Sequence, residues 1–118
     1  MTQREPRQAD YLSHMLEAIS LTRSYVEGLG KTDFIHDKRT QQAVILNIMV
    51  IGEAATKLAD EYPEFVALFP QVQWKSMRGM RNRLAHGYFD INLDVVWETI
   101  KQALPELEVQ LRQIQQAL

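Results

Sequence analysis

The 118-residue sequence contains no cysteine, which excludes disulfide bonds, cysteine nucleophiles and metal sites with cysteine ligands. Its three histidines do not cluster, so neither a metal nor a cofactor is predicted, and His14 and His36 are expected at the surface. Long apolar runs are also missing, because the longest, Ala43 to Ile51, is interrupted by Asn47 and is far too short to span a bilayer. The polar N-terminal stretch does not resemble a signal peptide, and these absences together favour a cytoplasmic protein with no membrane contact.

An excess of one charge is missing as well, because 13 Lys and Arg against 15 Asp and Glu leave a net charge of -2. This balance excludes a protein that holds nucleic acid mainly by its overall charge, so any RNA binding must be local. Hydrophobic residues make up 46% of the sequence and charged residues 24%, which is typical of a folded globular protein. The length predicts a single domain over residues 1–118, with residues 1–8 as a flexible N-terminal arm.

Hydrophobic side chains recur every three or four residues along most of the chain, which predicts helices and no strands. The first helix is expected from about Asp10 to Glu27, where glycines close it. The second is expected to start at an Asp37 cap and to continue to about Tyr62, where Pro63 stops it. Because the middle of this second helix has almost no polar face, it is predicted to be the central element and a candidate interface.

Two further main helices and two short ones complete the predicted fold. Short helical pieces are expected around Phe34 and Ile35 and from Glu64 to Leu68. The third main helix directs an apolar stripe toward the core, made of Trp74, Met77, Met80 and Leu84. Lys75 and Arg78 then point away from the core, with Arg81 as a further candidate for that polar side.

The last main helix has an unbroken apolar stripe and one proline. Asn92 or Asp90 can cap its start, and Pro105 predicts a kink because proline removes a helical hydrogen bond and clashes with the preceding turn. The third helix is expected to end at His86 and Gly87. The predicted fold class is therefore all-α, an antiparallel up-and-down bundle of four main helices with one or two short extra helices.

One short segment, Gly79 to Phe89, is distinguished by its chemistry, because it contains Arg81, Asn82, His86 and Tyr88. Arginine offers a planar, permanently charged group that matches phosphate oxygens, and histidine can act as an acid or a base near neutral pH. These two residue types suffice to cleave a phosphodiester bond without a metal ion.

Positive charge also gathers on the approach to His86. Lys75, Arg78 and Arg83 lie there beside Arg81 and are candidates for substrate binding. The alternative is a solvated helix face, and on charge alone that alternative is favoured.

Arg81 and His86 are five residues apart, which on an ideal helix is a rotation of about 140° and a rise of about 7.5 Å. They do not share a face, although Gly87 permits a left-handed cap that would redirect the chain around His86. One segment also supplies a single histidine, whereas cleavage needs a base for the ribose 2′-hydroxyl and an acid for the leaving oxygen. A two-fold dimer with both segments near its axis would supply both groups.

Each residue of the segment also has an ordinary structural interpretation. Arg81 could pair with a carboxylate such as Glu53, His86 could interact with the helix dipole, and Tyr88 and Phe89 could belong to the core. On spacing alone these interpretations are favoured, since Arg-x4-His occurs often by chance.

The chain resembles the HepT-like branch of the HEPN-domain proteins. The resemblance rests on the run Gly79-Met80-Arg81-Asn82-x-Leu84-x-His86-x-Tyr88-Phe89, on Ile51-Gly52-Glu53-Ala54-Ala55 and on Arg39-Thr40-Gln41. Similar stretches near the two ends are Asp10-Tyr11-Leu12, Val96-Trp97 and Leu104-Pro105-Glu106-Leu107, in the same order. The similarity therefore covers nearly the whole chain.

This resemblance implies an all-helical homodimer that is the toxin of a type VII HEPN/MNT toxin-antitoxin system. Family members cut RNA without a metal ion, with the motif arginine and histidine as the catalytic pair, here Arg81 and His86. Asn82 is then the polar residue that helps to shape the site. The family's partner is a minimal nucleotidyltransferase antitoxin that attaches AMP to the motif tyrosine, here Tyr88.

Two other functions stay open at this point. One is a non-catalytic helical dimer that docks to a nucleotidyltransferase as a binding or scaffold module, and the other is a purely structural bundle. Cleavage of RNA by the purified protein without metal separates the enzyme from the docking module. The absence of a neighbouring nucleotidyltransferase gene would favour the structural bundle.

Overall fold

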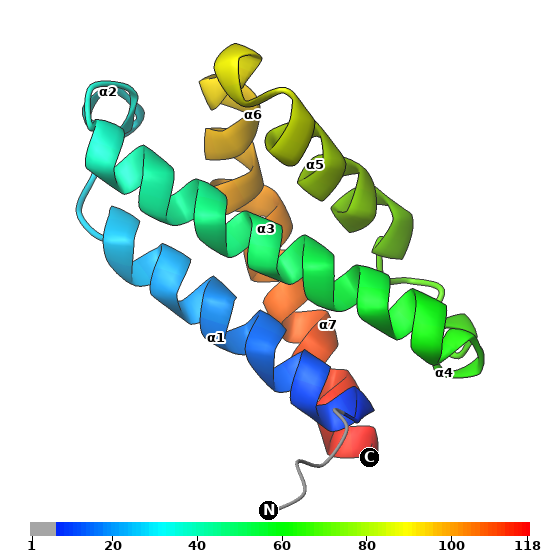
Figure 1. Cartoon of the computed structure of the whole chain (residues 1–118). Helices are drawn as coiled ribbons and strands as arrows, with labels where there is room; N and C mark the ends of the chain where they lie inside the picture. Colours follow the sequence, from blue (N-terminus) through cyan, green and yellow to red (C-terminus); the bar gives the residue numbers. More distant parts are fainter. Residues whose placement is uncertain (1–6) are drawn as a thin grey trace, which may run out of the picture.

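The computed structural model describes residues 7–118, and for Tyr88 it describes the backbone alone (Figure 1). The predicted N-terminal arm falls mainly on residues 1–6, which lie outside the described residues, and Gln8 already begins the first helix. The helical elements are α1 (Gln8–Val26), α2 (Lys31–Ile35), α3 (Lys38–Glu61), α4 (Pro63–Ala67), α5 (Trp74–His86), the 3-10 turn η1 (Tyr88–Asp90), α6 (Leu93–Glu98), the π-helical turn η2 (Thr99–Ala103) and α7 (Leu104–Ala117). The described part of the chain has no strand, so the all-α prediction is confirmed.

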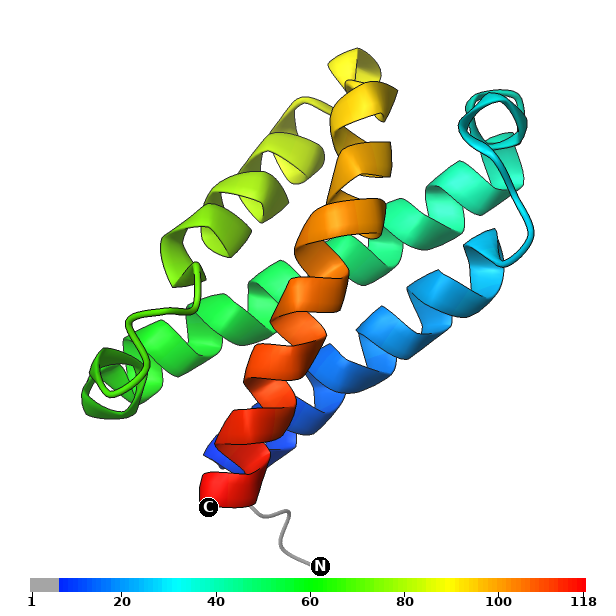
Figure 2. The same ribbon diagram turned by 180° about the vertical axis from the view of Figure 1, so that it is seen from behind.

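Three long helices, α1, α3 and α5, lie side by side with α3 in the middle (Figure 1). The continuous helical stretch of α6, η2 and α7 runs obliquely across one face of these three helices (Figure 2). One apolar cluster joins α1, the second half of α3 and α7, and a second joins the first half of α3 to the end of α5 and to α6. Helix α3 contributes to both clusters and is the central element, as predicted.

Local interactions explain where α3 begins and ends. The carboxylate of Asp37 caps it by accepting hydrogen bonds from the amide of Thr40 at 3.1 Å and from the hydroxyl of Thr40 at 2.6 Å. These bonds lower the pKa of Asp37 below its usual value. The helix ends at Glu61, because the following Pro63 lacks the N–H that would continue it.

By length and composition, α3 is the one helix among residues 7–118 that could reach across a bilayer. Half of its most apolar window is buried inside the protein. The polar interruption at Asn47 is satisfied within the helix, since its amide donates to the carbonyl oxygen of Ala43 at 2.9 Å. The helices packed around α3 therefore cover only part of its apolar surface, and Leu46 and Val50 stay exposed.

The final helical stretch starts at the cap that the sequence indicated. The side-chain oxygen of Asn92 accepts hydrogen bonds from the amides of Asp94 and Val95 at 3.0 and 3.3 Å. Directly before Pro105, the chain takes the wider π-helical turn η2. Proline cannot donate the hydrogen bond of a regular helix, and its ring clashes with the preceding turn. The wider π-helical turn gives the ring the space that it needs.

Candidate active site

Helix α5 carries the basic side chains that the sequence analysis selected. From Trp74 to His86 it contains four Lys or Arg residues and no acidic residue, and it ends at His86 as predicted. Because residues four apart on a helix are neighbours, Arg78, Asn82 and His86 form one row along α5. Asn82 and His86 are exposed and Arg78 is half-buried, so the row is accessible to solvent. The structure therefore brings these three predicted site residues onto one face.

Arg81 lies on the side of α5 that faces α3. Its side chain is 26% exposed, and it shares a face with the buried Trp74, which lies seven residues, or almost two turns, before it. The two helices approach closely because residue 52 is glycine. A Cβ atom on Gly52 would lie 2.5 Å from Cβ of Arg81 and 2.7 Å from the carbonyl oxygen of Met77. Arg81 was only a further candidate for the side of α5 that points away from the core, and it does not lie there, since its side chain packs along α3.

The guanidinium of Arg81 is held by two residues of α3. Nη1 is 3.4 Å from Oε2 of Glu53, which is the carboxylate that the ordinary interpretation named. Nη2 donates to the hydroxyl oxygen of Thr56 at 3.4 Å. Since a guanidinium has five N–H donors, these contacts leave an N–H on each terminal nitrogen for an anion.

The remaining donor of Arg81 is unusual. Its Nε is the single side-chain nitrogen or oxygen in the described part of the chain that is buried without a hydrogen-bond partner. Leaving such a donor unsatisfied costs about 1 to 3 kcal/mol, and native proteins contain few of them. The contacts of Arg81 with Glu53 and Thr56 therefore have to offset this cost.

Arg78 contacts the same stretch of α3. Its Nη2 is 2.6 Å from Oδ1 of Asp60 and 3.4 Å from the carbonyl oxygen of Thr56. Its Nε donates to the hydroxyl oxygen of Thr56 at 3.5 Å. Two arginines from successive turns of α5 thus meet at one threonine of α3.

His86 is exposed at the C-terminal end of α5, where a positive charge interacts favourably with the helix dipole. The left-handed cap that the sequence permits is absent, because Gly87 has φ -110°. The amide of Gly87 donates to the carbonyl oxygen of Arg83 at 2.8 Å, and a Cβ on Gly87 would lie 2.9 Å from that oxygen. The chain therefore does not redirect His86 toward Arg81, and the two remain on different sides of α5.

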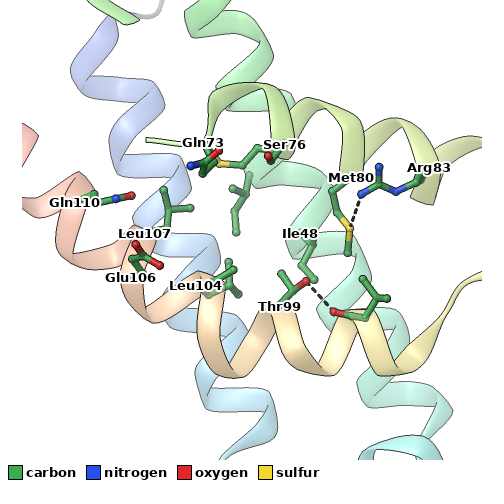
Figure 3. A pocket seen from close by; sticks show the side chains of 14 residues that line it. Ile48, Gln73, Ser76, Met80, Arg83, Thr99, Leu104, Glu106, Leu107 and Gln110 are labelled. Atoms are coloured by element: carbon green, nitrogen blue, oxygen red, sulfur yellow. Dashed lines mark hydrogen bonds between the residues drawn. The ribbon is translucent and has the colours of Figure 1, made fainter. Parts of the chain in front are cut away.

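Arg83 lies apart from Arg78, but it lines a shallow hollow at the end of α5 together with His86. Figure 3 shows it beside Met80 at one end of an apolar groove between α5 and the stretch from α6 to α7. Its Nη2 lies 3.7 Å from the sulfur of Met80. Neither Arg83 nor the exposed Lys75 makes an ion pair within residues 7–118.

The segment after α5 is only partly described. The side chain of Tyr88 lies outside the described residues, so its predicted modification is not tested. Phe89 is 96% exposed, so the interpretation of Phe89 as a core residue is wrong.

Comparison with known proteins places the chain in a family. The sequence model described as "Ribonuclease HepT-like" matches residues 15–114. The chain belongs to the HepT-like ribonuclease family. Over 99 residues this HepT-like protein is 37% identical to "Probable ribonuclease HepT" of Thermococcus cleftensis, and the match covers 84% of this chain and 87% of the relative. Over 106 residues it is also 37% identical to a protein of Caldanaerobacter subterraneus subsp. tengcongensis named "Putative RNase", with 90% and 92% of the two chains covered. No solved structure matches the chain significantly.

Sequence reasoning about this HepT-like protein missed two residues of the site. Thr56 and Asp60 contact the arginines of α5, but neither was a candidate. A signal was present, since Glu53, Thr56 and Asp60 recur at helical spacing on one side of α3. The spacing does not indicate which helix these residues face. Only the close approach of the two helices at Gly52 identifies α5 as the helix that they contact.

Proposed function

We propose that this HepT-like protein is a metal-independent endoribonuclease and the toxin of a type VII HEPN/MNT toxin-antitoxin system in the cytoplasm. The observation that carries the proposal is the guanidinium of Arg81, which α3 holds in place while N–H groups of both terminal nitrogens stay available. His86 is exposed at the end of the same helix. The relatives named as ribonucleases support the same class of reaction.

The proposed reaction is an internal transfer within the RNA strand. A base removes the proton of the ribose 2′-hydroxyl, the 2′-oxygen forms a bond to the neighbouring phosphorus, and the bond from phosphorus to the 5′-oxygen breaks. An acid protonates the departing 5′-oxygen, so the products end in a 2′,3′-cyclic phosphate and a free 5′-hydroxyl. Arg81 stabilises the charge on the non-bridging oxygens, and His86 moves one of the two protons. Asn82, one helical turn before His86, orients the substrate.

A second copy of the chain completes the proposed site. One copy supplies one imidazole, and α5 holds it on a different side from Arg81, so a single copy does not gather all the groups that the reaction needs. Helix α3 offers a surface for the second copy, because Leu46 and Val50 are exposed on the side of α3 that continues to Glu53. Since Glu53 contacts Arg81, an interface on this surface would bring the arginines close to the two-fold axis.

The proposed control acts through Tyr88, two residues after His86. A minimal nucleotidyltransferase uses ATP, the phenol oxygen of Tyr88 forms a bond to the α-phosphorus, and pyrophosphate leaves. The attached phosphate adds negative charge where the RNA phosphate must enter and competes for the arginines of α5. The modification would silence the site by blocking it and by repelling the substrate.

Cleavage of single-stranded RNA in the presence of a metal chelator tests the enzyme proposal. Arg81→Ala and His86→Ala should each lower the rate by about a hundredfold or more, with unchanged helical circular dichroism. Arg112→Ala is a matched control, because this exposed arginine pairs with Glu108 of its own helix, α7. If both α5 variants cut RNA like the parent, the docking module replaces the enzyme as the better proposal.

Intact mass and RNA cleavage test the control by Tyr88. Incubation with the partner nucleotidyltransferase and ATP should add the mass of AMP to the parent and stop cleavage. Tyr88→Phe should cut RNA, gain no mass and keep its activity under the same conditions. Equal silencing of the Phe variant would refute modification at this tyrosine.

A further inference from the structure

We infer that Thr56 is a positioning residue, which holds Arg81 at the scissile phosphate and Arg78 at the next phosphate of the same RNA strand. This inference rests on the proposed ribonuclease activity and adds a residue from α3 to it.

The hydroxyl of Thr56 uses all of its hydrogen-bonding capacity. A hydroxyl donates one hydrogen bond and accepts two. The Thr56 hydroxyl donates to the carbonyl oxygen of Gly52 at 2.8 Å, and its oxygen accepts from Nη2 of Arg81 at 3.4 Å and from Nε of Arg78 at 3.5 Å. Because the hydroxyl proton is used in the bond to Gly52, both lone pairs remain to accept from the arginines of α5. The residue is buried, which shields these contacts from water.

A neutral oxygen suits a pair of arginines better than a third carboxylate would. The Glu53 and Asp60 carboxylates already lie beside Arg81 and Arg78 and offset their charge. Thr56 holds the two guanidiniums close together without removing more of the positive charge that a phosphate needs. Both arginines lie within 3.5 Å of one oxygen, so they can act on neighbouring phosphates of one strand. The contacts of the two arginines with the Thr56 oxygen are long in the absence of RNA, and they are expected to shorten when RNA binds.

Thr56→Val tests this role, because it removes the hydroxyl and keeps the branched shape. We expect kcat on a single-stranded RNA oligonucleotide to fall by between about tenfold and a hundredfold, because Arg81 is no longer held in place. KM should rise as well, since Arg78 loses the same anchor. Thr56→Ser retains the hydroxyl and should restore most of the parental rate.

Thr22 provides a matched control. It is fully buried in α1, and its hydroxyl donates to the carbonyl oxygen of Ala18 at 2.8 Å, the same bond that Thr56 makes to Gly52. Thr22→Val therefore reports the effect of losing a buried threonine hydroxyl that makes no hydrogen bond to Arg78 or Arg81. An equal loss of rate in the two Val variants, or a parental rate in Thr56→Val, would overturn the inference.

The side-chain N–H resonances of the arginines give a readout that does not depend on activity. Thr56→Val should shift the Nε–H resonance of Arg78 and the Nη–H resonances of Arg81, which are the groups that donate to Thr56, whereas Thr22→Val should leave them unchanged. Unchanged resonances in Thr56→Val overturn the positioning role even in a protein that cuts RNA. Shifted resonances in a protein that cuts no RNA refute the proposed function and leave the anchoring of the arginines by Thr56 standing.

Discussion

Replacing Gly52 by alanine tests whether the close approach of α3 and α5 builds the site. The new Cβ would lie 2.5 Å from Cβ of Arg81 and 2.7 Å from the carbonyl oxygen of Met77, whereas carbon atoms in ordinary contact are about 3.5 to 4.0 Å apart. Both neighbouring atoms belong to the backbone of α5 or are fixed directly to it, so no side-chain rotation relieves the contact. Helix α5 must move away from α3 by about 1 Å.

The expected change in the free energy of unfolding of Gly52→Ala is the sum of two opposing effects. Overpacking of this kind costs about 1 to 3 kcal/mol, and the upper end applies because backbone has to move. Alanine favours the helix over glycine by about 1 kcal/mol. Gly52→Ala should therefore lower the free energy of unfolding by about 2 kcal/mol. Its RNA cleavage should fall too, because Arg81 moves away from Thr56.

Gly79→Ala is the matched control for this prediction. Gly79 lies within α5, and a Cβ there would meet only the end of the flexible Arg83 side chain, at 3.5 Å. Here the helix preference of alanine should dominate, and the stability should rise by about 0.5 to 1 kcal/mol. Urea denaturation followed by circular dichroism measures both variants. A Gly52→Ala protein as stable as the parent would refute the close-approach argument.

Two further predictions concern stability at high pH and assembly. Burial and the hydrogen bond to Glu61 raise the pKa of Tyr11, so its contribution to stability is complete below about pH 10, the range of a free tyrosine, and is lost as the pH rises through the higher folded value. The thermal midpoint of the parent should therefore fall more steeply above pH 10 than that of Tyr11→Phe, and parallel curves would contradict this. Leu46→Glu should give a monomer in light scattering and lower RNA cleavage, because Leu46 is 61% exposed on the proposed interface. Val109→Glu, at a 57% exposed position on α7, should keep the parental mass, and two variants of parental mass would exclude α3 as the interface.

The helices were predictable because their signals are local. The apolar periodicity, the cap at Asp37 and the stop at Pro63 define α3, and the structure places the helix between them. The cap at Asn92 was one of two alternatives, and the hydrogen bonds to its side chain decide between them. The π-helical turn before Pro105 was predicted only as a kink, because the sequence does not show how the chain redistributes the missing hydrogen bond.

The orientation of Arg81 was harder to predict, because its charge favours the solvent side of α5 whereas its place in the helical repeat favours the buried side. A charged residue is normally assigned to the solvent side of a helix, yet Arg81 lies almost two turns from the buried Trp74 and shares its face. Glu53 was named as a partner from the sequence, and the structure confirms that contact. Thr56 was not named for two reasons. A neutral residue gives no charge pattern, and Thr56 is far along the chain from Arg78 and Arg81, so the sequence does not indicate the contact.

The charges around α5 also bear on how a protein with a net charge of -2 could act on RNA. Arg78 and Arg81 are each paired with a carboxylate of α3, and both carboxylates are largely exposed to solvent. An ion pair that solvent reaches contributes little free energy, so an RNA phosphate can replace the Asp60 carboxylate beside Arg78 at small cost. A carboxylate that is freed takes up a cation while the phosphate releases one, so the salt dependence of RNA affinity should be shallow compared with that of a strongly basic protein. The specificity of such a site would come from the placement of Arg78 and Arg81 around Thr56 rather than from the overall charge of the protein.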